Sequence, residues 1–374
     1  MIDSKVLSGD SHIDLRFMPE NTFLDNAPAG LRDRMPHIEE TQQGLRWLAD
    51  GCDLGVVGTF VTETQSTEMN ERTRLMVEGG FFEDQDIGWH PTNVELRLRD
   101  QDKDGIEGEV MYGLLRIGQQ LTDSNLITEI FKLYNDWVAN FCKQAPGRFA
   151  ALACIPSHDP DVAAEELRRA ASIGLHGADF GVNSVSTPIY HGDRDPLWKA
   201  SHDTGLPISF HTTGLIPMRS TSGQGKAYDP MFHDIRTVLF QLSGAEFLTS
   251  IVLSGACERF PDFKFVLGEC GIGWIPYVLD RMDHEAEHAE GLKLKPSEYW
   301  QRQGASTYQN EGIASQIIPM VGEDNVMWGS DYPHPDGTWP DSRKYIASNL
   351  KTLDNPTVFN KVIYGNTKRL YGFS

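Results

Sequence analysis

Short apolar runs alternate with polar loops and helix-period segments along most of the chain. This alternation is typical of βα units, in which each strand of a parallel sheet is followed by a crossover helix. Eight runs have the character of strands, which is the number that a closed barrel of this kind requires. They cover residues 6–13, 108–112, 149–155, 177–180, 207–211, 264–268, 305–308 and 325–329. The sequence therefore predicts an α/β fold, a (β/α)8 barrel.

The segments between these runs carry helix signals. Residues 159–174 begin with Asp159, a favourable N-cap, and continue with Pro160 in the first turn. Alanine and leucine follow at helical spacing, and Gly174 stands where a helix commonly ends. Residues 123–143 and 274–288 also have apolar residues at helical spacing. These segments are predicted to be helices that cover the barrel.

Two segments are longer than a crossover needs. Residues 16–105 separate the first predicted strand from the second, and residues 212–230 are rich in Gly, Ser and Thr. Long loops inside a compact domain are usually functional covers or disordered. We expect both segments to be lids over the barrel mouth. Because α/β barrels often exceed 250 residues, residues 1–374 are expected to form a single domain.

Composition excludes several classes of function. The chain has 53 acidic and 33 basic residues, for a formal net charge of −20, which disfavours binding to nucleic acid or to anionic membranes. The cysteines show no CxxC pair, which indicates reduced thiols. Neither a signal peptide nor an apolar stretch of about 20 residues is visible. These features predict a cytoplasmic protein that acts on a small molecule.

Polar residues at the ends of the predicted strands are the candidates for chemistry, because active sites of such barrels form at the carboxyl ends of the strands. Asp10 and His12 lie at the end of the first strand and share one face, since residues i and i+2 of a strand point the same way. His211 ends the fifth strand, and Asp331 follows the eighth. Two imidazoles with carboxylates suit zinc, manganese or iron.

Each of these residues also has an ordinary structural interpretation. Most D-x-H matches occur by chance, a histidine that ends an apolar run is often a hydrogen-bonded core residue, and the SDYP segment around Asp331 could be a simple turn. The four residues at strand ends, in chain order, are much harder to explain by chance. Together they favour a metal site.

Six segments of the sequence resemble one family. They are GDSHID, RLRDQDKDGIEGEVMYG, GRFAALACIP, PISFHTTG, SGACERFPDFKFVLGECGIGWIPYVLDRMD and NVMWGSDYPHPDGTWPDS, and they span nearly the whole chain. The chain resembles the amidohydrolase-related family that includes aminocarboxymuconate-semialdehyde decarboxylase and metal-dependent aromatic-acid decarboxylases. The resemblance implies a distorted TIM barrel and metal ligands at Asp10, His12, His211 and Asp331. It also implies a homo-oligomer or pairing with a related subunit.

The chain departs from the family pattern at two positions. Many members begin with an H-x-H pair, whereas this chain has Asp10-x-His12 or, alternatively, His12-x-Asp14. Asp10 is favoured because family decarboxylases with an acidic first ligand use E-x-H. On the sixth strand, many members have a catalytic histidine where this chain has Glu269. The resemblance therefore does not carry a histidine acid/base onto this chain.

Glu269 has two interpretations. It is either a hydrogen-bond acceptor that orients a ligand histidine, or a metal ligand or general acid/base. Asp10, Glu269 and Asp331 together bring three negative charges, which one divalent ion leaves at −1 and two ions turn to +1. His334 is a further candidate ligand or substrate contact. One or two ions per chain are therefore expected.

These residues predict a metal-dependent hydrolase or non-oxidative decarboxylase acting on a small organic acid or amide. In hydrolysis, Asp331 would take the proton of a metal-activated water. In decarboxylation, Asp331 or Glu269 would deliver a proton to carbon. Loop positions suggest three substrate contacts, at Arg116, Arg219 and Trp339. The alternatives are a dinuclear non-haem iron or manganese oxygenase and a catalytically inactive barrel subunit.

Overall fold

Eight parallel strands form the centre of the computed structural model, which describes residues 4–58, 71–181, 187–211, 235, 238–286 and 291–374. The strands pair in chain order, and the predicted (β/α)8 barrel is confirmed. They are β1 (Leu7–Ser8), β5 (Gly108–Met111), β6 (Phe149–Ile155), β7 (Gly177–Phe180), β8 (Ile208–His211), β9 (Phe265–Gly268), β10 (Gly304–Tyr308) and β11 (Val326–Trp328). Each one falls within, or within one residue of, a predicted strand.

The barrel closes between its first and last strands. The Gly9 amide donates to the Trp328 carbonyl at 2.8 Å, and the Asp331 amide donates to the Asp10 carbonyl at 3.0 Å. Ser11 also pairs with Tyr332 in parallel register. Strand β1 is shorter than the predicted 6–13, because beyond Ser8 the chain keeps only isolated bridges to its neighbours. Closure therefore brings the two ends of the sequence together.

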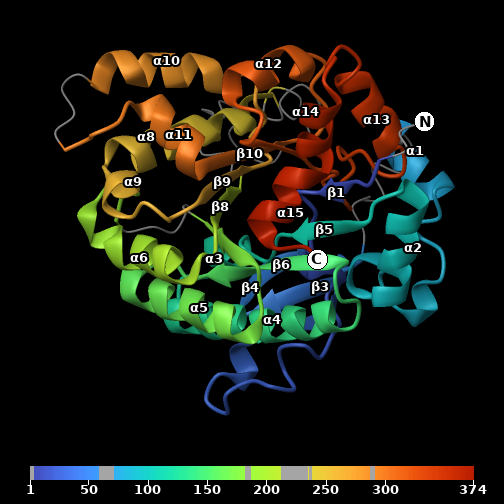
Figure 1. Ribbon diagram of the computed structural model, residues 1–374. Coiled ribbons are helices and arrows are strands. Elements are labelled where there is room, and N and C mark those ends of the chain that lie inside the picture. Colours follow the sequence, from blue (N-terminus) through green and yellow to red (C-terminus); the bar gives the residue numbers. More distant parts are fainter. Residues whose placement is uncertain (1–3, 59–70, 182–186, 212–234, 236–237, 287–290) are drawn as a thin grey trace.

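Helices surround the strands (Figure 1). They are α1 (Glu71–Glu78), α2 (Val94–Asp104), α3 (Ile117–Gln120), α4 (Ser124–Lys143), α5 (Pro160–Ile173), α6 (Asp195–Thr204), α8 (Gly244–Leu253), α9 (Ala256–Arg259), α10 (Ile275–Glu285), α11 (Pro296–Gln303), α12 (Ala314–Val321), α13 (Ser342–Asn349), α14 (Pro356–Asn360) and α15 (Asn366–Tyr371). Helix α5 has the predicted ends. The Asp159 carboxylate accepts from the amides of Asp161 and Val162, and Gly174 is left-handed with φ +88°.

The long segment between β1 and β5 contains structure that the sequence did not predict. An antiparallel sheet is formed by β2 (His37–Thr41), β3 (Gly44–Ala49) and β4 (Cys52–Val56). Helix α2 then leads into β5 and ends at Gly105, a left-handed residue with φ +74°. Because residues of β3 and β4 line the cavity described below, this sheet lies at the barrel mouth. The second predicted lid, residues 212–230, lies outside the described residues.

Two apolar layers build the core. One layer lies inside the barrel and includes the aromatic ring of Tyr371, from the last helix. Its members include Leu7, Val110, Ala150, Leu152, Val266, Ala305, Met327 and Tyr371. The outward-facing strand residues pack against the helices in a larger cluster. All five cysteines are free thiols, as predicted. Within the described ranges, no helix is both long and apolar enough to cross a bilayer.

Candidate metal centre

The four predicted ligands converge at one end of the barrel. Asp10 and His12 follow β1, His211 ends β8, and Asp331 follows β11. The His12 Nε2 atom lies 3.1 Å from Asp331 Oδ1 and 3.3 Å from Asp10 Oδ1. The His211 Nε2 atom lies 3.6 Å from the same Asp10 oxygen. Asp10 and Asp331 are fully buried, and His12 is nearly so.

The donor atoms of this cluster fit a divalent metal. Asp10 Oδ1, His12 Nε2 and Asp331 Oδ2 are buried without a well-formed hydrogen bond to any described residue. Leaving such atoms unsatisfied is costly, so each one calls for a partner. The ligand atoms of Asp10, His12 and His211 lie within 4.8 Å of one another. One ion with nitrogen and oxygen ligands at about 2.0–2.2 Å could bind Asp10, His12 and His211 together.

The geometry also separates the two candidate aspartates of the first strand. Thr307 Oγ1 donates to Asp10 Oδ2 at 3.0 Å, which leaves Asp10 Oδ1 directed at the two histidines. Such a hydrogen bond orients a ligand carboxylate. Asp14 instead lies 3.4 Å from His334 Nε2 and belongs to none of the potential ligand groups found among the described residues. Asp10 is thus the better-placed partner of His12.

Glu269 and His334 lie at the edge of the same cluster. The Glu269 Oε2 atom is 3.5 Å from His211 Nε2, and its Oε1 accepts from Gln309 at 3.3 Å. His334 Nδ1 is 2.8 Å from Asp331 Oδ1, and its ring stacks on that of His12. His12, Asp331 and His334 make a second potential ligand group. A third group joins Glu269 and Asp331 to Asp336, which the sequence analysis missed although it lies in the quoted WGSDYPHPDG segment.

Two of these acidic residues have unusual backbone conformations. Glu269 has φ +51° and Asp331 has φ +56°, both in the left-handed region. Residues other than glycine seldom adopt this conformation, and where they do it is often at a functional site. Glu269 directly follows β9, and Asp331 lies three residues beyond the end of β11, where the chain leaves the barrel. The left-handed turn lets each carboxylate remain buried beside the histidines.

Electrostatics divide the buried carboxyl groups into two kinds. Burial alone would raise the pKa of Asp10 and of Asp331, but contacts with the neighbouring histidines lower both pKa values overall. Burial and the charge of Asp331 hold the pKa of Glu269 well above its usual range. Burial also raises the pKa of Asp179, at the end of β7, to about 6. Asp10 and Asp331 are therefore suited to be anionic ligands, whereas Glu269 and Asp179 are suited to carry protons.

A cavity of about 760 Å³ opens above the cluster. Its base carries His12, His211, Glu269 and His334. Apolar side chains from the β3–β4 sheet and from the segment after β5 form a wall: Trp47, Leu54, Val56, Leu114, Leu115 and Ile117. The rest of the lining is largely charged or polar. Cavities of this size typically bind small molecules.

Comparison with known proteins identifies the family. The amidohydrolase family model matches residues 47–373, which is most of the chain. This chain belongs to the amidohydrolase family. The resemblance inferred from the sequence is thereby confirmed.

Several amidohydrolase relatives are decarboxylases. Gamma-resorcylate decarboxylase of Polaromonas sp. is 25% identical over 283 residues, covering 69% of this chain and 84% of the relative. The 2-amino-3-carboxymuconate-6-semialdehyde decarboxylase of Dictyostelium discoideum is 22% identical over 280 residues, covering 71% and 73%. Such relatives support the conclusion that the chain is an enzyme.

Solved amidohydrolase structures share the fold. An amidohydrolase from Mycobacterium avium subsp. paratuberculosis superposes with a TM-score of 0.78 at 18% identity and covers 100% of both chains. A dihydroxybenzoic acid decarboxylase from Polaromonas sp. JS666 gives a TM-score of 0.61 at 23% identity, covering 81% of this chain and 94% of the other. The latter structure contains bound manganese and the inhibitor 2-nitroresorcinol.

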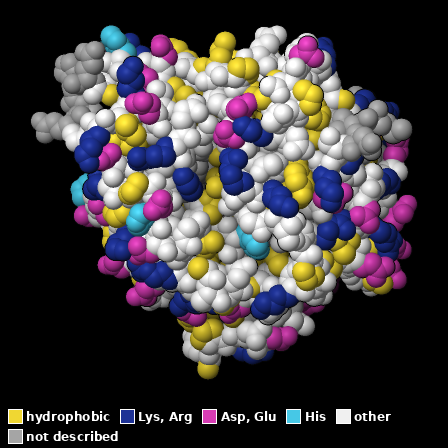
Figure 2. All heavy atoms as spheres, viewed as in Figure 1, with side chains coloured by type: hydrophobic (Ala, Val, Ile, Leu, Met, Phe, Trp, Pro, Cys, Tyr) yellow, Lys and Arg dark blue, Asp and Glu magenta, His cyan; other side chains and the backbone are white. Residues whose placement is uncertain are grey.

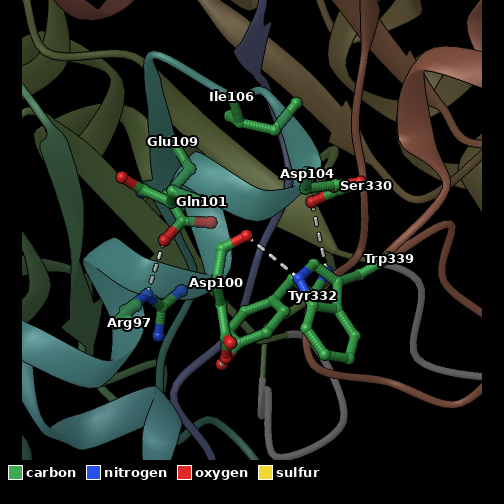
Figure 3. Close-up of a pocket in the computed structure, with 9 residues that line it drawn as sticks. All are labelled: Arg97, Asp100, Gln101, Asp104, Ile106, Glu109, Ser330, Tyr332 and Trp339. Carbon is green, nitrogen blue, oxygen red and sulfur yellow. Dashed lines mark hydrogen bonds and ion pairs between the residues drawn. The ribbon is translucent and has the colours of Figure 1, made fainter. Parts of the chain in front are cut away.

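The three predicted substrate contacts have different positions in this amidohydrolase. Arg116 lines the cavity, and Arg219 lies outside the described residues. Trp339 is buried away from the lining of that cavity. Its indole nitrogen donates to the Asp100 carbonyl at 3.1 Å, in a much smaller cavity beside α2 (Figure 3). The geometry thus supports a substrate contact only for Arg116.

Sequence reasoning missed two cavity residues. Arg16 follows the first strand and lines the cavity together with Arg116. Burial lowers the pKa of Arg16, and the nearby charge of Arg116 lowers it further. Asp179 is the penultimate residue of the fourth barrel strand and also lines the cavity. The strand-end rule that selected His211 could have selected Asp179 as well.

Side chains of helix α2 contact both of the chain segments that carry candidate ligands at the barrel closure, the segment after β1 and the segment after β11. The Arg97 guanidinium donates to the His12 carbonyl at 2.9 Å and to Ser11 Oγ at 3.0 Å, and it pairs with Glu109. The Tyr332 hydroxyl, next to Asp331, donates to Asp100 at 2.6 Å. Of these, Arg97, Asp100, Glu109 and Tyr332 are drawn in Figure 3. The insertion therefore supports the site as well as covering it.

Proposed function

We propose that this chain is a metal-dependent, non-oxidative decarboxylase of a small organic carboxylic acid. The observation that carries the proposal is a pair of overlapping potential ligand groups, Asp10–His12–His211 and His12–Asp331–His334. Their three histidines line a cavity of about 760 Å³. The decarboxylases among the relatives support this reaction over hydrolysis.

The chemistry of the cavity fits such a substrate. A divalent ion, when bound, supplies positive charge that holds the substrate carboxylate and stabilises negative charge as the reaction proceeds. Asp10 and Asp331 remain ionised and orient this centre, since their pKa values are lowered. Trp47, Leu54 and Leu114 present an apolar wall to the organic part of the substrate and exclude water.

The cavity also has a basic side. Arg16 and Arg116 both line it, and both guanidinium groups attract an anionic substrate. Arg16 lies 4.0 Å from Asp14, which also lines the cavity, so the two arginines give positive charge to one part of a lining that contains acidic residues as well. The whole chain has a net charge of −20. On the face shown in Figure 2, acidic and basic side chains are interspersed. Capture of the substrate therefore depends on these two arginines and not on the overall charge.

A second candidate function is oxidative. Glu269, Asp331 and Asp336 form a potential ligand group next to the first one, and His12 and Asp331 each belong to more than one group. Two ions sharing these residues would resemble a dinuclear iron or manganese oxygenase. The carboxylate-rich third group is the observation that favours this alternative.

One experiment separates the two candidates. Protein purified without added metal is analysed for its elements and then supplied with carboxyl-labelled aromatic acids, beginning with 2,6-dihydroxybenzoate. A decarboxylase releases one labelled CO2 per substrate consumed and uses no dissolved oxygen. Oxygen consumption that matches substrate loss, together with two iron or manganese ions per chain, would support the oxygenase instead.

A further inference from the structure

Asp179 is a buried acidic residue with no assigned role. It lies near the end of β7, between Ala178 and Phe180, which pack outward against the helices. Because successive residues of a strand point to opposite faces, Asp179 faces the barrel interior. It lines the large cavity, yet only 2% of its surface is exposed. A carboxyl group in this position needs an explanation, since buried acidic residues are normally paired.

Only one of the Asp179 oxygens has a partner among the described residues. Oδ2 accepts from the Gly113 amide at 3.1 Å, which fixes the orientation of the side chain. Oδ1 is buried and has no hydrogen bond to the described part of the protein. A purely structural carboxyl group would have both oxygens satisfied. Oδ1 is enclosed by its surroundings and keeps hydrogen-bonding capacity that no described residue uses.

Asp179 differs in this respect from Glu269, the other proton-carrying candidate. Glu269 contacts His211 with one oxygen and Gln309 with the other. Strand β8, which carries His211, lies between the strands of Asp179 and Glu269. The two carboxyl groups thus lie on either side of the strand that carries His211. Glu269 is tied to a predicted metal ligand, whereas Asp179 is held by a backbone amide.

We propose that Asp179 is the proton donor of the decarboxylation, acting through Oδ1 on the substrate carbon that loses CO2. This inference rests on the proposed function. As the bond between that carbon and the carboxylate breaks, its electron pair stays on the carbon and takes the Asp179 proton. CO2 leaves, and the Asp179 carboxylate recovers a proton from water. The net change is consumption of one carboxylate and one proton, and release of one CO2 and one protonated product.

The charges around Asp179 allow it to hold a proton. Burial raises its pKa to about 6, near neutrality, where a general acid works well. The groups that face it come from several neighbouring elements: His211, His12, Asp10, Tyr112, Tyr134, Cys154 and Tyr371. The two charges of a divalent ion are balanced by ionised Asp10 and Asp331, so the ion leaves little excess positive charge to ionise Asp179.

The first test measures the proton directly and needs no substrate. Zn²⁺-loaded protein with ¹³C at the aspartate side-chain carboxyls is titrated between about pH 4 and pH 9 by NMR. Two signals should titrate far above the usual aspartate range, one from Asp179 and one from Asp104, whose pKa burial raises to about 7. Asp179→Asn and Asp104→Asn assign them. If Asp179→Asn does not fold, Asp104→Asn alone identifies the remaining signal as Asp179.

The second test uses turnover of an acid that the wild-type protein decarboxylates. Asp179→Asn keeps an acceptor for the Gly113 amide and should retain metal content and KM. It should lower kcat about 10²–10⁴-fold, the usual loss for a general acid. Asp179→Glu should restore part of kcat. Asp104→Asn, a matched change at a buried aspartate outside the cavity, should leave turnover close to wild type.

The outcomes separate the two proposals. A wild-type protein that binds metal but releases no CO2 from any acid contradicts the proposed function, and the titration then still decides whether Asp179 is protonated. An Asp179 signal that stays ionised throughout, or an Asp179→Asn variant with undiminished kcat, overturns the role of Asp179. A lowered kcat with unchanged metal content and KM supports it.

Discussion

The Nε2 atom of His12 lies 3.1 Å from the Oδ1 atom of Asp331, although the two residues come from opposite ends of the chain. Closure of the barrel between β1 and β11 creates this contact, through backbone pairing of Ser11 with Tyr332. The metal cluster therefore depends on the interactions that hold these two strand ends together. The Arg97 side chain contacts both ends. It donates to the His12 carbonyl after β1 and packs over the Tyr332 ring after β11.

Replacing Arg97 by Met should destabilise the fold. The change leaves buried Glu109 without its partner and removes the hydrogen bonds to Ser11 and His12. Breaking a buried ion pair from one side typically costs about 3–5 kcal/mol. Urea denaturation of the metal-free protein measures the effect. Arg99→Met, an exposed change on the same helix, is the control and should have little effect; equal losses in both variants would contradict this account.

Folding stability should depend on pH through Asp104. Burial raises the pKa of Asp104 in the folded protein to about 7, well above the usual aspartate value of about 3.9. The folded protein then binds this proton more tightly than the unfolded chain does. The contribution of Asp104 is therefore most favourable below about pH 4, declines as the pH rises to about 7, and is constant above that. Asp104→Asn should flatten the curve of unfolding free energy against pH over this range, whereas an unchanged slope would rule out the shifted pKa.

Arg116 should affect substrate capture more than chemistry. It is exposed at the cavity and close enough to Arg16 to influence its pKa. Arg116→Gln removes one charged hydrogen-bond donor, so KM for an anionic substrate should rise about tenfold while kcat changes little. Steady-state kinetics at low and high salt measure this. Arg281→Gln, an exposed change on α10, provides the control; a fall in kcat alone would assign Arg116 a different role.

Glu269→Gln should report the number of ions. With one ion held by Asp10, His12, His211 and Asp331, the variant keeps its metal and loses about 10²–10⁴-fold in turnover if Glu269 takes part in proton transfer. With two ions, the neutral amide is a poorer ligand, and the variant should lose one of them. Metal analysis beside the wild-type protein distinguishes these results. Full metal content with undiminished turnover would exclude both roles of Glu269.

The positions of the strands were predictable because each one is a short apolar run between polar segments. All eight predicted runs contain a barrel strand. The β2–β4 sheet was not predicted, since its strands are short and partly exposed and lack a run of consecutive buried apolar residues. Such strands are stabilised by pairing with each other, which the local sequence pattern does not reveal.

The candidate ligands were predictable from strand ends, whereas their neighbours were not. Asp10, His12, His211 and Asp331 were found because sequence patterns place them at the same end of the barrel. The hydrogen bond from Thr307 to Asp10, and the lack of a hydrogen bond from any described residue to Asp179 Oδ1, depend on distances across the barrel. Assembly with a second copy or with a related subunit stays a prediction, and so does the role of Arg219.

The measurement that tests the central claim most directly is metal content together with CO2 release in His12→Ala and His211→Ala. Both side chains belong to the ligand cluster and neither is needed for the apolar core, so both variants should fold. The exposed His284→Ala variant is the control. The account predicts that both cluster variants lose bound metal and CO2 release, while His284→Ala keeps both. Full metal content and undiminished CO2 release in both cluster variants would contradict it.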